Sequence, residues 1–116
     1  LIPVQVEYYA LTGLALIRQT AELVRDLNPD LAILGLVLTF FDARKTLNKD
    51  VAAALADEWG DALFSTRIRD NVSLAEAPSN GQDVFSYKRS CYGAKDYAAF
   101  AAEFLERTEG CYGTRG

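Results

Sequence analysis

Polar side chains follow three apolar segments of the sequence whose composition is typical of β-strands. Glu7 follows the first segment, Asp42 the second, and Arg69 and Asn71 the third. In open α/β sheets, ligands bind beyond the carboxyl ends of the strands. If the three segments form one parallel sheet, these groups meet at one edge and can line a binding site. The alternative is that they belong to ordinary polar surface loops.

The sequence holds no complete set of catalytic residues. It has no histidine, which excludes histidine-based triads and histidine zinc sites. Its eight glycines form neither Gly-x-Gly-x-x-Gly nor Gly-Lys-Ser/Thr, so the common phosphate-binding loops are missing. Glu7 and Asp42 could pair as general acid and base, or they could be surface carboxylates. Cys91 and Cys111 are predicted to be free thiols, and no catalytic or metal-binding residue is expected.

Apolar periodicity predicts the elements that position these groups. Continuous apolar runs predict strands over residues 1–6, 33–39 and 63–68. Helical spacing predicts an amphipathic helix of about 18 residues that includes Leu11 and Val24. It also predicts helices over residues 47–59 and 94–105. Thr46 or Asn48 is expected to cap the middle helix and Gly60 to end it.

The predicted elements run in the order β-α-β-α-β, then a long connection over residues 69–91, then a helix. Alternating strands and helices indicate an α/β fold, a parallel sheet with flanking helices. Connections longer than about 15 residues are usually functional. The sequence therefore predicts a site near the carboxyl ends of the strands, beside this connection.

Length and composition favour one globular domain. The chain has 116 residues, 50% of them hydrophobic and 24% charged. Its longest nearly unbroken apolar run, residues 31–41, is shorter than the roughly 20 residues of a membrane span. No signal peptide is predicted, which favours the cytoplasm. Because the chain lacks methionine and begins with an apolar strand-like run, we expect it to be a piece of a longer protein.

The net charge of −4 is unevenly distributed. Residues 1–43 and 90–116 are acidic, whereas residues 44–89 carry equal numbers of acidic and basic side chains. Bulk charge therefore does not attract nucleic acid. The neutral middle leaves two interpretations open, a local basic patch or a solvated surface of mixed charge.

Four segments resemble, in the same order, segments of the ParA/Soj-type partition ATPases. They are IPVQVEYYALTGL (2–14), LTFFDAR (38–44), NVSLAEAPSNG (71–81) and GAKDY (93–97). The first resembles the segment after the Walker B strand, and the others resemble the next strand end, the long loop and the last helix. Together they span nearly the whole chain. The resemblance implies the carboxyl-terminal half of a P-loop NTPase-like domain, over residues 1–107, with residues 108–116 as a flexible tail.

Members of this family are deviant-Walker ATPases that form ATP-sandwich dimers, bind DNA non-specifically and segregate chromosomes or plasmids with a ParB-type partner. The resemblance implies ATP and Mg²⁺ in the complete protein, located in the cytoplasm on the nucleoid. The P-loop lysine and the magnesium-binding segments would precede Leu1. We therefore expect this chain alone to bind no cofactor tightly and to be inactive as an ATPase.

The resemblance also implies roles for individual residues in nucleotide binding. Thr39 stands where the family has a strand-end contact to the base. Arg69, Asp70 and Asn71 stand in the loop that covers the base, and Glu7 where an acidic residue lies near the partner's ribose.

A DNA surface is implied around Arg44, with Arg67 and Arg69 as further candidates. The sequence departs from the family pattern at two positions of this surface. Ser73 replaces a common arginine, and Asp70 adds a negative charge beside Asn71. The end of the chain carries no amphipathic membrane helix, so no membrane partner is expected.

Two other functions stay open, a regulatory or positioning module of the same fold and an unrelated α/β domain. The resemblance implies that the strand over residues 1–6 pairs with residues 33–39 on one side and, on the other, with a P-loop strand that this chain lacks, so that edge is left open. An open apolar edge is a template for pairing. We therefore expect it to bind the protein's own amino-terminal half or a second copy.

Overall fold

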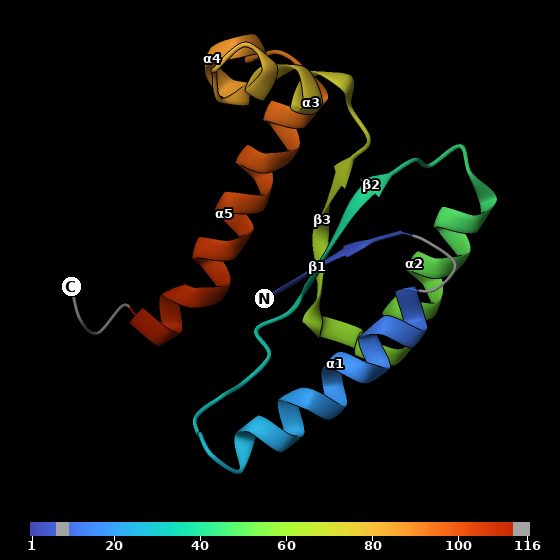
Figure 1. Cartoon of the computed structure of the whole chain (residues 1–116), viewed down its shortest axis with the longest axis vertical. Coiled ribbons are helices and arrows are strands. Elements are labelled where there is room, and N and C mark those ends of the chain that lie inside the picture. The colour runs from blue at the N-terminus through green and yellow to red at the C-terminus, as the bar shows by residue number, and fades with distance from the viewer. Residues whose placement is uncertain (7–9, 113–116) are drawn as a thin grey trace.

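Strands and helices alternate along the chain (Figure 1). The computed structural model describes residues 1–6 and 10–112. The elements are β1 (Ile2–Gln5), α1 (Ala10–Arg25), β2 (Leu36–Phe41), α2 (Thr46–Trp59), a short 3₁₀ turn η1 (Gly60–Ala62), β3 (Leu63–Arg69), α3 (Val72–Ser79), α4 (Val84–Lys88) and α5 (Tyr92–Tyr112). The predicted order of strands and main helices is confirmed.

The three strands form one parallel sheet in the order β1-β2-β3. The predicted α/β fold is therefore confirmed. The central strand begins later than predicted, at Leu36 rather than residue 33. The apolar run 31–41 is continuous, so it does not indicate at which residue the strand begins. The strand begins where Leu36 pairs with Ile2 of β1 and Leu63 of β3.

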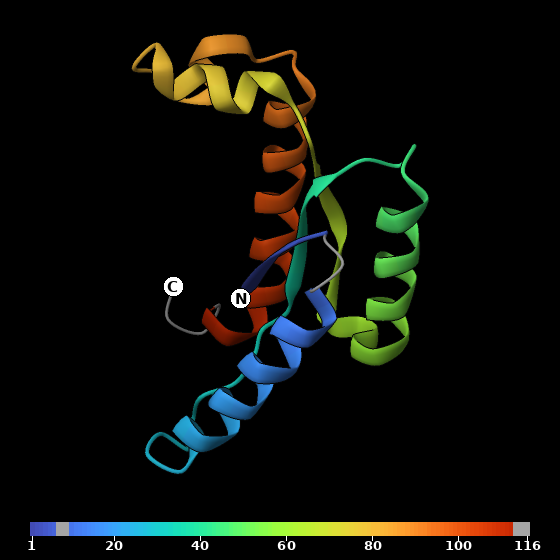
Figure 2. The same ribbon diagram turned by 45° about the vertical axis from the view of Figure 1, so that its right-hand side comes forward.

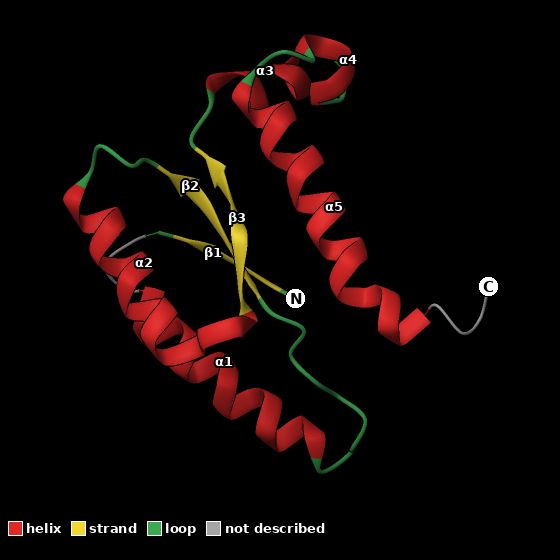
Figure 3. Ribbon diagram, turned by 180° about the vertical axis from the view of Figure 1, so that it is seen from behind, coloured by secondary structure: helices red, strands yellow, loops and turns green. Residues whose placement is uncertain are grey.

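Helices cover both faces of the sheet (Figures 2 and 3). On one face, Leu36 and Leu38 of β2 pack in a cluster of nine buried residues that includes Leu14 of α1 and Leu55 of α2. On the other face, Val37 packs with Phe64 and Ile68, and α5 adds Phe100 and Phe104. Successive β2 side chains thus enter opposite cores, as the continuous apolar run predicts.

The start of α2 differs from the prediction. Neither Thr46 nor Asn48 caps the helix, because Lys45 occupies the N-cap position without a side-chain hydrogen bond. Asn48 is buried instead. Its Nδ2 donates to the Val6 carbonyl (3.3 Å) and its Oδ1 accepts from the Asp42 N–H (2.8 Å), which ties α2 to two strand ends. Gly60 ends the helix as predicted, with a φ of 55° that favours glycine.

The long connection is more ordered than predicted. It contains α3 and α4, and the Asp83 carboxylate caps α4 by accepting from the Ser86 N–H (2.8 Å). The last helix begins at Tyr92 and continues to Tyr112, so residues 108–112, which we expected in the tail, are helical. The Thr108 hydroxyl donates to the Phe104 carbonyl (2.9 Å) within this extension. None of the helices in residues 1–6 and 10–112 is long and apolar enough to cross a membrane.

Candidate functional site

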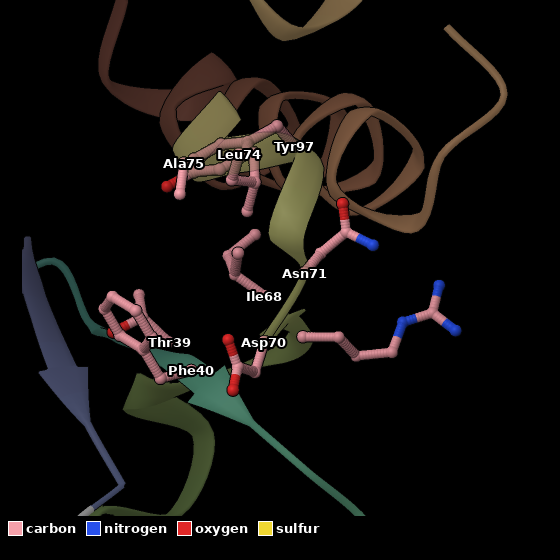
Figure 4. A pocket seen from close by; sticks show the side chains of 9 residues that line it. Thr39, Phe40, Ile68, Asp70, Asn71, Leu74, Ala75 and Tyr97 are labelled. Carbon is pink, nitrogen blue, oxygen red and sulfur yellow. The ribbon is translucent and has the colours of Figure 1, made fainter. Parts of the chain in front are cut away.

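A cavity of about 190 Å³ lies at the carboxyl ends of β2 and β3, where ligands of α/β sheets bind. Figure 4 shows Thr39 and Phe40 of β2 facing Leu74, Ala75 and Tyr97, with Ile68 and Asp70 between them. Asn71 and Arg69 complete the lining. The structure therefore brings four predicted nucleotide-site residues to one cavity: Thr39, Arg69, Asp70 and Asn71.

The backbone of Phe40 is strained at the mouth of this cavity. Its φ is 54°, a left-handed conformation that is uncommon for a bulky residue. The pairing of β2 with β3 shifts register over the same stretch. The residue is 59% exposed, although Phe40 lies within a strand of the core sheet. Such strain clusters at functional sites because the surrounding structure must hold it in place.

The Asn71 side chain has an unsatisfied acceptor. Its Oδ1 is buried without a hydrogen-bond partner in the described part of the chain. Asn71 precedes α3 at the N-cap position, but its side chain makes no capping bond. A buried acceptor without a partner costs free energy unless a ligand or water supplies a donor. The amide is therefore a candidate ligand contact.

The Arg69 guanidinium is bound to α5 and not to the cavity alone. Its Nη2 lies 2.8 Å from Asp96 Oδ1, and its Nε lies 3.0 Å from Asp96 Oδ2. The Arg69 N–H also donates to Asp96 Oδ2 (2.9 Å), and the guanidinium stacks 4.0 Å from the Tyr92 ring centroid. These hydrogen bonds to Asp96 raise the pKa of Arg69. Arg69 therefore joins β3 to α5.

Two other candidate carboxylates are placed differently. Glu7 lies outside the described residues, so its predicted ribose contact stays a prediction. Asp42 does not line the cavity, and its Oδ2 lies 3.0 Å from Arg44 Nη2. Hydrogen bonds from the Arg44 side chain and N–H lower the pKa of Asp42 to about 2.

The predicted DNA-binding arginines lie near the carboxyl ends of β2 and β3, but each has a partner. The Arg44 side chain is 91% exposed and paired with Asp42. The Arg67 guanidinium lies 4.6 Å from the Phe41 ring centroid, whereas Arg69 turns toward Tyr92 and Asp96. Arg44 and Arg67 thus remain candidates for phosphate contacts, while the charge of Arg69 is neutralised by Asp96.

Sequence reasoning missed several contributors. Phe40 carries no signal, because positive φ is expected of glycine or asparagine rather than phenylalanine. Tyr97 lies in the predicted last helix, where no ligand contact was expected, yet it lines the cavity. Asp96 is 8% exposed, and a buried carboxylate on a helix signals a partner such as Arg69. No group of three potential metal ligands occurs in residues 1–6 and 10–112.

A parallel α/β sheet with a cavity at the carboxyl ends of its strands is consistent with a partial P-loop NTPase-like domain. No protein-family model matches the chain. The chain is 44% identical over 108 residues to an uncharacterized protein of Pseudomonas putida, an overlap that covers 92% of this chain and 41% of the relative.

Named relatives show the same coverage. The chromosome-partitioning ATPase Soj of Treponema pallidum is 42% identical over 107 residues, 91% of this chain and 42% of the relative. The chromosome partitioning protein ParA of Caulobacter vibrioides is 40% identical over 107 residues, 91% of this chain and 40% of the relative. The chain is thus homologous to the ParA/Soj family of chromosome-partitioning ATPases, and it spans about two-fifths of the length of these relatives.

Proposed function

We propose that the chain is the carboxyl-terminal part of a ParA-like partition ATPase and that it supplies the pocket for the nucleotide base. The observation that carries this proposal is the cavity at the carboxyl ends of β2 and β3, lined by Thr39, Asp70 and Asn71. The named relatives are chromosome-partitioning proteins, which supports the same conclusion.

The chemistry of the cavity suits one flat ring system. Ile68, Leu74 and Tyr97 supply apolar walls, and Thr39 and Asn71 supply polar atoms. Its volume of about 190 Å³ is below the roughly 300–1,000 Å³ of pockets that hold whole drug-sized ligands. The cavity would therefore hold the base of a nucleotide and leave the phosphates outside. The unpartnered Asn71 Oδ1 would accept from an N–H of the base.

The remaining properties of the whole protein are part of the proposal. ATP and Mg²⁺ would be held mainly by segments outside this chain, which contains no Gly-Lys-Ser/Thr loop. The protein would work in the cytoplasm on the nucleoid, as a dimer on non-specific DNA with a ParB-type partner. Partition of a chromosome or a plasmid would follow from ATP-dependent switching between these partners.

Arg44 and Arg67 would contribute to the DNA surface. The Arg44 side chain is 91% exposed, and its charge is offset by Asp42. If Arg44 contacts a phosphate, the Arg44→Ala substitution should weaken DNA binding equally for all DNA sequences. It should also reduce the slope of log affinity against log salt by about one unit. An unchanged slope would show that Arg44 does not contact a DNA phosphate.

A second candidate function is an interaction module of the same fold without partition activity. It is favoured by an apolar groove of about 580 Å³ along α5, lined by Leu1, Phe100, Phe104 and Leu105 among others. The groove is compatible with both functions, since a dimerising ATPase also needs a covered apolar face. A measurement of nucleotide binding distinguishes the partition ATPase from the interaction module.

Equilibrium dialysis of the chain with radiolabelled adenosine and ATP tests the proposed pocket. Both ligands should bind weakly and with similar affinity, because the cavity would hold the base alone. Asn71→Ala and Thr39→Val should each weaken binding by about tenfold, the loss of one hydrogen bond to the ligand. Asn28→Ala and Thr20→Val are matched controls remote from the cavity and should bind as the unmodified chain does. Equal affinity in all four variants, or no adenosine binding, would refute the base pocket.

A further inference from the structure

The β3 strand lies at an edge of the sheet, and α5 runs alongside it (Figure 3). Within residues 1–6 and 10–112, β3 pairs with β2 on one side and with no strand on the other. An edge strand presents backbone N–H and C=O groups that no neighbouring strand satisfies, and a strand of another chain can pair with them. The outer edge of β3 is therefore a possible place of association.

Side chains of α5 occupy the outward N–H groups of β3. The Glu103 carboxylate accepts from the N–H groups of Ser65 and Thr66, both at 2.8 Å. Asp96 Oδ2 accepts from the N–H of Arg69 (2.9 Å). In the part of the chain that the structure describes, these are the only strand N–H groups that bind a side chain, and both acceptors belong to α5.

Arg107 extends these contacts to the start of β3. Its Nη2 donates to the Leu63 carbonyl (3.2 Å) and to Glu103 Oε2 (3.0 Å). Asp96, Glu103 and Arg107 follow each other at spacings of seven and four positions, which places them on one face of the helix. One stripe of α5 thus follows β3 from its first residue, Leu63, to its last, Arg69.

The backbone of β3 is irregular where Glu103 binds it. Two steps along β2, from Leu36 to Leu38, oppose four steps along β3, from residue 63 to residue 67. In a regular ladder, neighbouring N–H groups point to opposite edges, so one carboxylate cannot bind two in succession. The bulge allows Ser65 and Thr66 to donate to the same side chain. Bulges also disturb the pairing of edge strands.

Apolar packing already attaches α5 to the sheet, since Phe100 and Phe104 pack on the cluster around Phe64. The carboxylates are not needed for this packing, and burying them costs solvation free energy. The side chains of Asp96 and Glu103 are nevertheless only 11% and 16% exposed. Their position on the N–H groups of an edge strand indicates a second role beside attachment.

A second copy of β3 fits this edge by its sequence. In an antiparallel pair of two β3 strands centred on Thr66, Arg67 of each strand would face Ser65 of the other, and Arg69 would face Leu63. No two arginines would lie opposite each other, and opposed like charges are what destabilises a strand pair. A second copy of the chain is therefore the partner that matches the edge.

We propose that α5 covers the outer edge of β3 and prevents a second copy of the chain from pairing there. Glu103 and Asp96 occupy the N–H groups that the carbonyls of an incoming strand need, and Arg107 occupies a carbonyl. Association through strand pairing is thereby directed to the open edge of β1. This role is independent of the proposed base pocket, because it involves only backbone groups of β3 and side chains of α5.

Residue-resolved amide hydrogen exchange, measured over a dilution series, tests the cover. In the unmodified chain, the Ser65 and Thr66 N–H groups should exchange slowly at every concentration. In dilute Glu103→Ala they should exchange at least about tenfold faster, while the Arg69 N–H, still bound by Asp96, keeps its rate. In concentrated Glu103→Ala, the Ser65 and Thr66 N–H groups should regain protection, because the uncovered edges of two copies pair.

Glu106→Ala is the matched control, since it removes an exposed carboxylate of the same helix. It should change neither the exchange rates of β3 nor their dependence on concentration. Cooperative thermal unfolding shows that each variant is folded. If Glu103→Ala does not fold, Glu103→Gln, which keeps one acceptor oxygen, should give the same pattern with a smaller change.

Two results would overturn the proposal. Unchanged exchange of the Ser65 and Thr66 N–H groups in the folded Glu103 variant would show that the carboxylate does not hold them in solution. Faster exchange that persists at high concentration would show that Glu103 only anchors α5 and that the uncovered β3 edge binds no second copy.

Discussion

The α2 and α5 helices each cover one face of the sheet, but they are attached by different chemistry. α2 buries Val51, Ala52 and Leu55 in the larger core cluster. α5 packs Phe100 and Phe104 on the smaller core cluster and is in addition held by polar side chains, since its Glu103 carboxylate accepts from the N–H groups of Ser65 and Thr66 of β3, both at 2.8 Å.

Further contacts of α5 are also polar or charged. Arg107 donates to the carbonyls of Asp61 (2.7 Å) and Leu63 (3.2 Å) and lies 4.1 Å from the centroid of the Phe64 ring. Asp96 binds Arg69 at the other end of the helix. Some large apolar side chains of α5 nevertheless lie at the surface, and Leu105 is 65% exposed.

The largest expected effect of this difference is self-association. The groove along α5 is apolar, and β1 pairs only with β2 in the described part of the sheet. An open apolar strand edge and an exposed apolar groove both favour association. Light scattering over a dilution series should therefore give at least twice the mass of one chain at micromolar concentration.

Two lysine substitutions sharpen this prediction. Leu105→Lys places a charge in the groove and should lower the measured mass. Leu23→Lys makes the same change on α1, where Leu23 is 70% exposed, and should not. A compact monomer at micromolar concentration with cooperative thermal unfolding would contradict the expected association.

The next effect concerns the apolar attachment of α2. Leu55 is fully buried, so Leu55→Ala should lower the free energy of unfolding by about 2–5 kcal/mol, the usual cost of such a cavity. Leu105→Ala on α5 should change it by less than about 0.5 kcal/mol when unfolding is measured below the concentration at which the chains associate. Denaturant unfolding measures both. An equal loss in the two variants would show that Leu105 is covered in solution.

The polar attachment of α5 predicts a smaller, pH-dependent effect. Burial raises the pKa of Glu103, but hydrogen bonds from Thr66, Ser65 and Arg107 outweigh it, so the net pKa is below the ordinary 4.5. Glu103→Gln should lower the free energy of unfolding at neutral pH by about 1–3 kcal/mol. Since the folded-state pKa is lowered, this contribution is complete above about pH 4.5 and is lost as the pH falls through the folded-state value.

Unfolding measured at several pH values checks the Glu103 prediction. The difference between the unmodified chain and Glu103→Gln should shrink in acid. Glu106→Gln, on the exposed side of the same helix, should show no such difference. A constant difference down to acid pH would mean that the Glu103 carboxylate is not held in its charged form.

The same contrast explains what the sequence could predict of the fold. Apolar spacing correctly predicted three parallel strands, α2 with its buried Leu55 and the stop at Gly60. It did not predict α3 and α4, because their short turns carry little periodicity. Apolar spacing also predicted an amphipathic α1, yet within residues 11–25 only Leu14 is buried, while Leu11 and Ile17 are exposed.

For the site, residues that end strands were predictable and residues that act through tertiary contacts were not. Thr39, Asp70 and Asn71 reach one cavity because they end neighbouring parallel strands. The partner of Arg69 could not be predicted, since Asp96 lies 27 positions away and meets it only when α5 packs on β3. Local spacing also gave no reason to expect the positive φ of Phe40.

The smallest expected effect on stability is at the ion pair in the loop before α2. Unlike the interactions of the Glu103 carboxylate, this pair has a partner that is almost fully exposed. Asp42 and Arg44 are two residues apart, and Arg44 is almost fully exposed. Hydrogen bonds from Arg44 lower the pKa of Asp42 from 3.8 to about 2. A lowered pKa means that the pair stabilises the fold above about pH 3.8 and that this contribution is lost as the pH falls through about 2. Carboxyl-carbon NMR titration should give a pKa of about 2 in the unmodified chain and a higher value in Arg44→Ala, although the N–H of residue 44 still donates to the carboxylate there. The midpoint of thermal unfolding should change little, because an ion pair with an exposed partner contributes little. A pKa near 3.8 in both proteins would show that the pair does not persist in solution, and Arg44 would then be free to meet a phosphate.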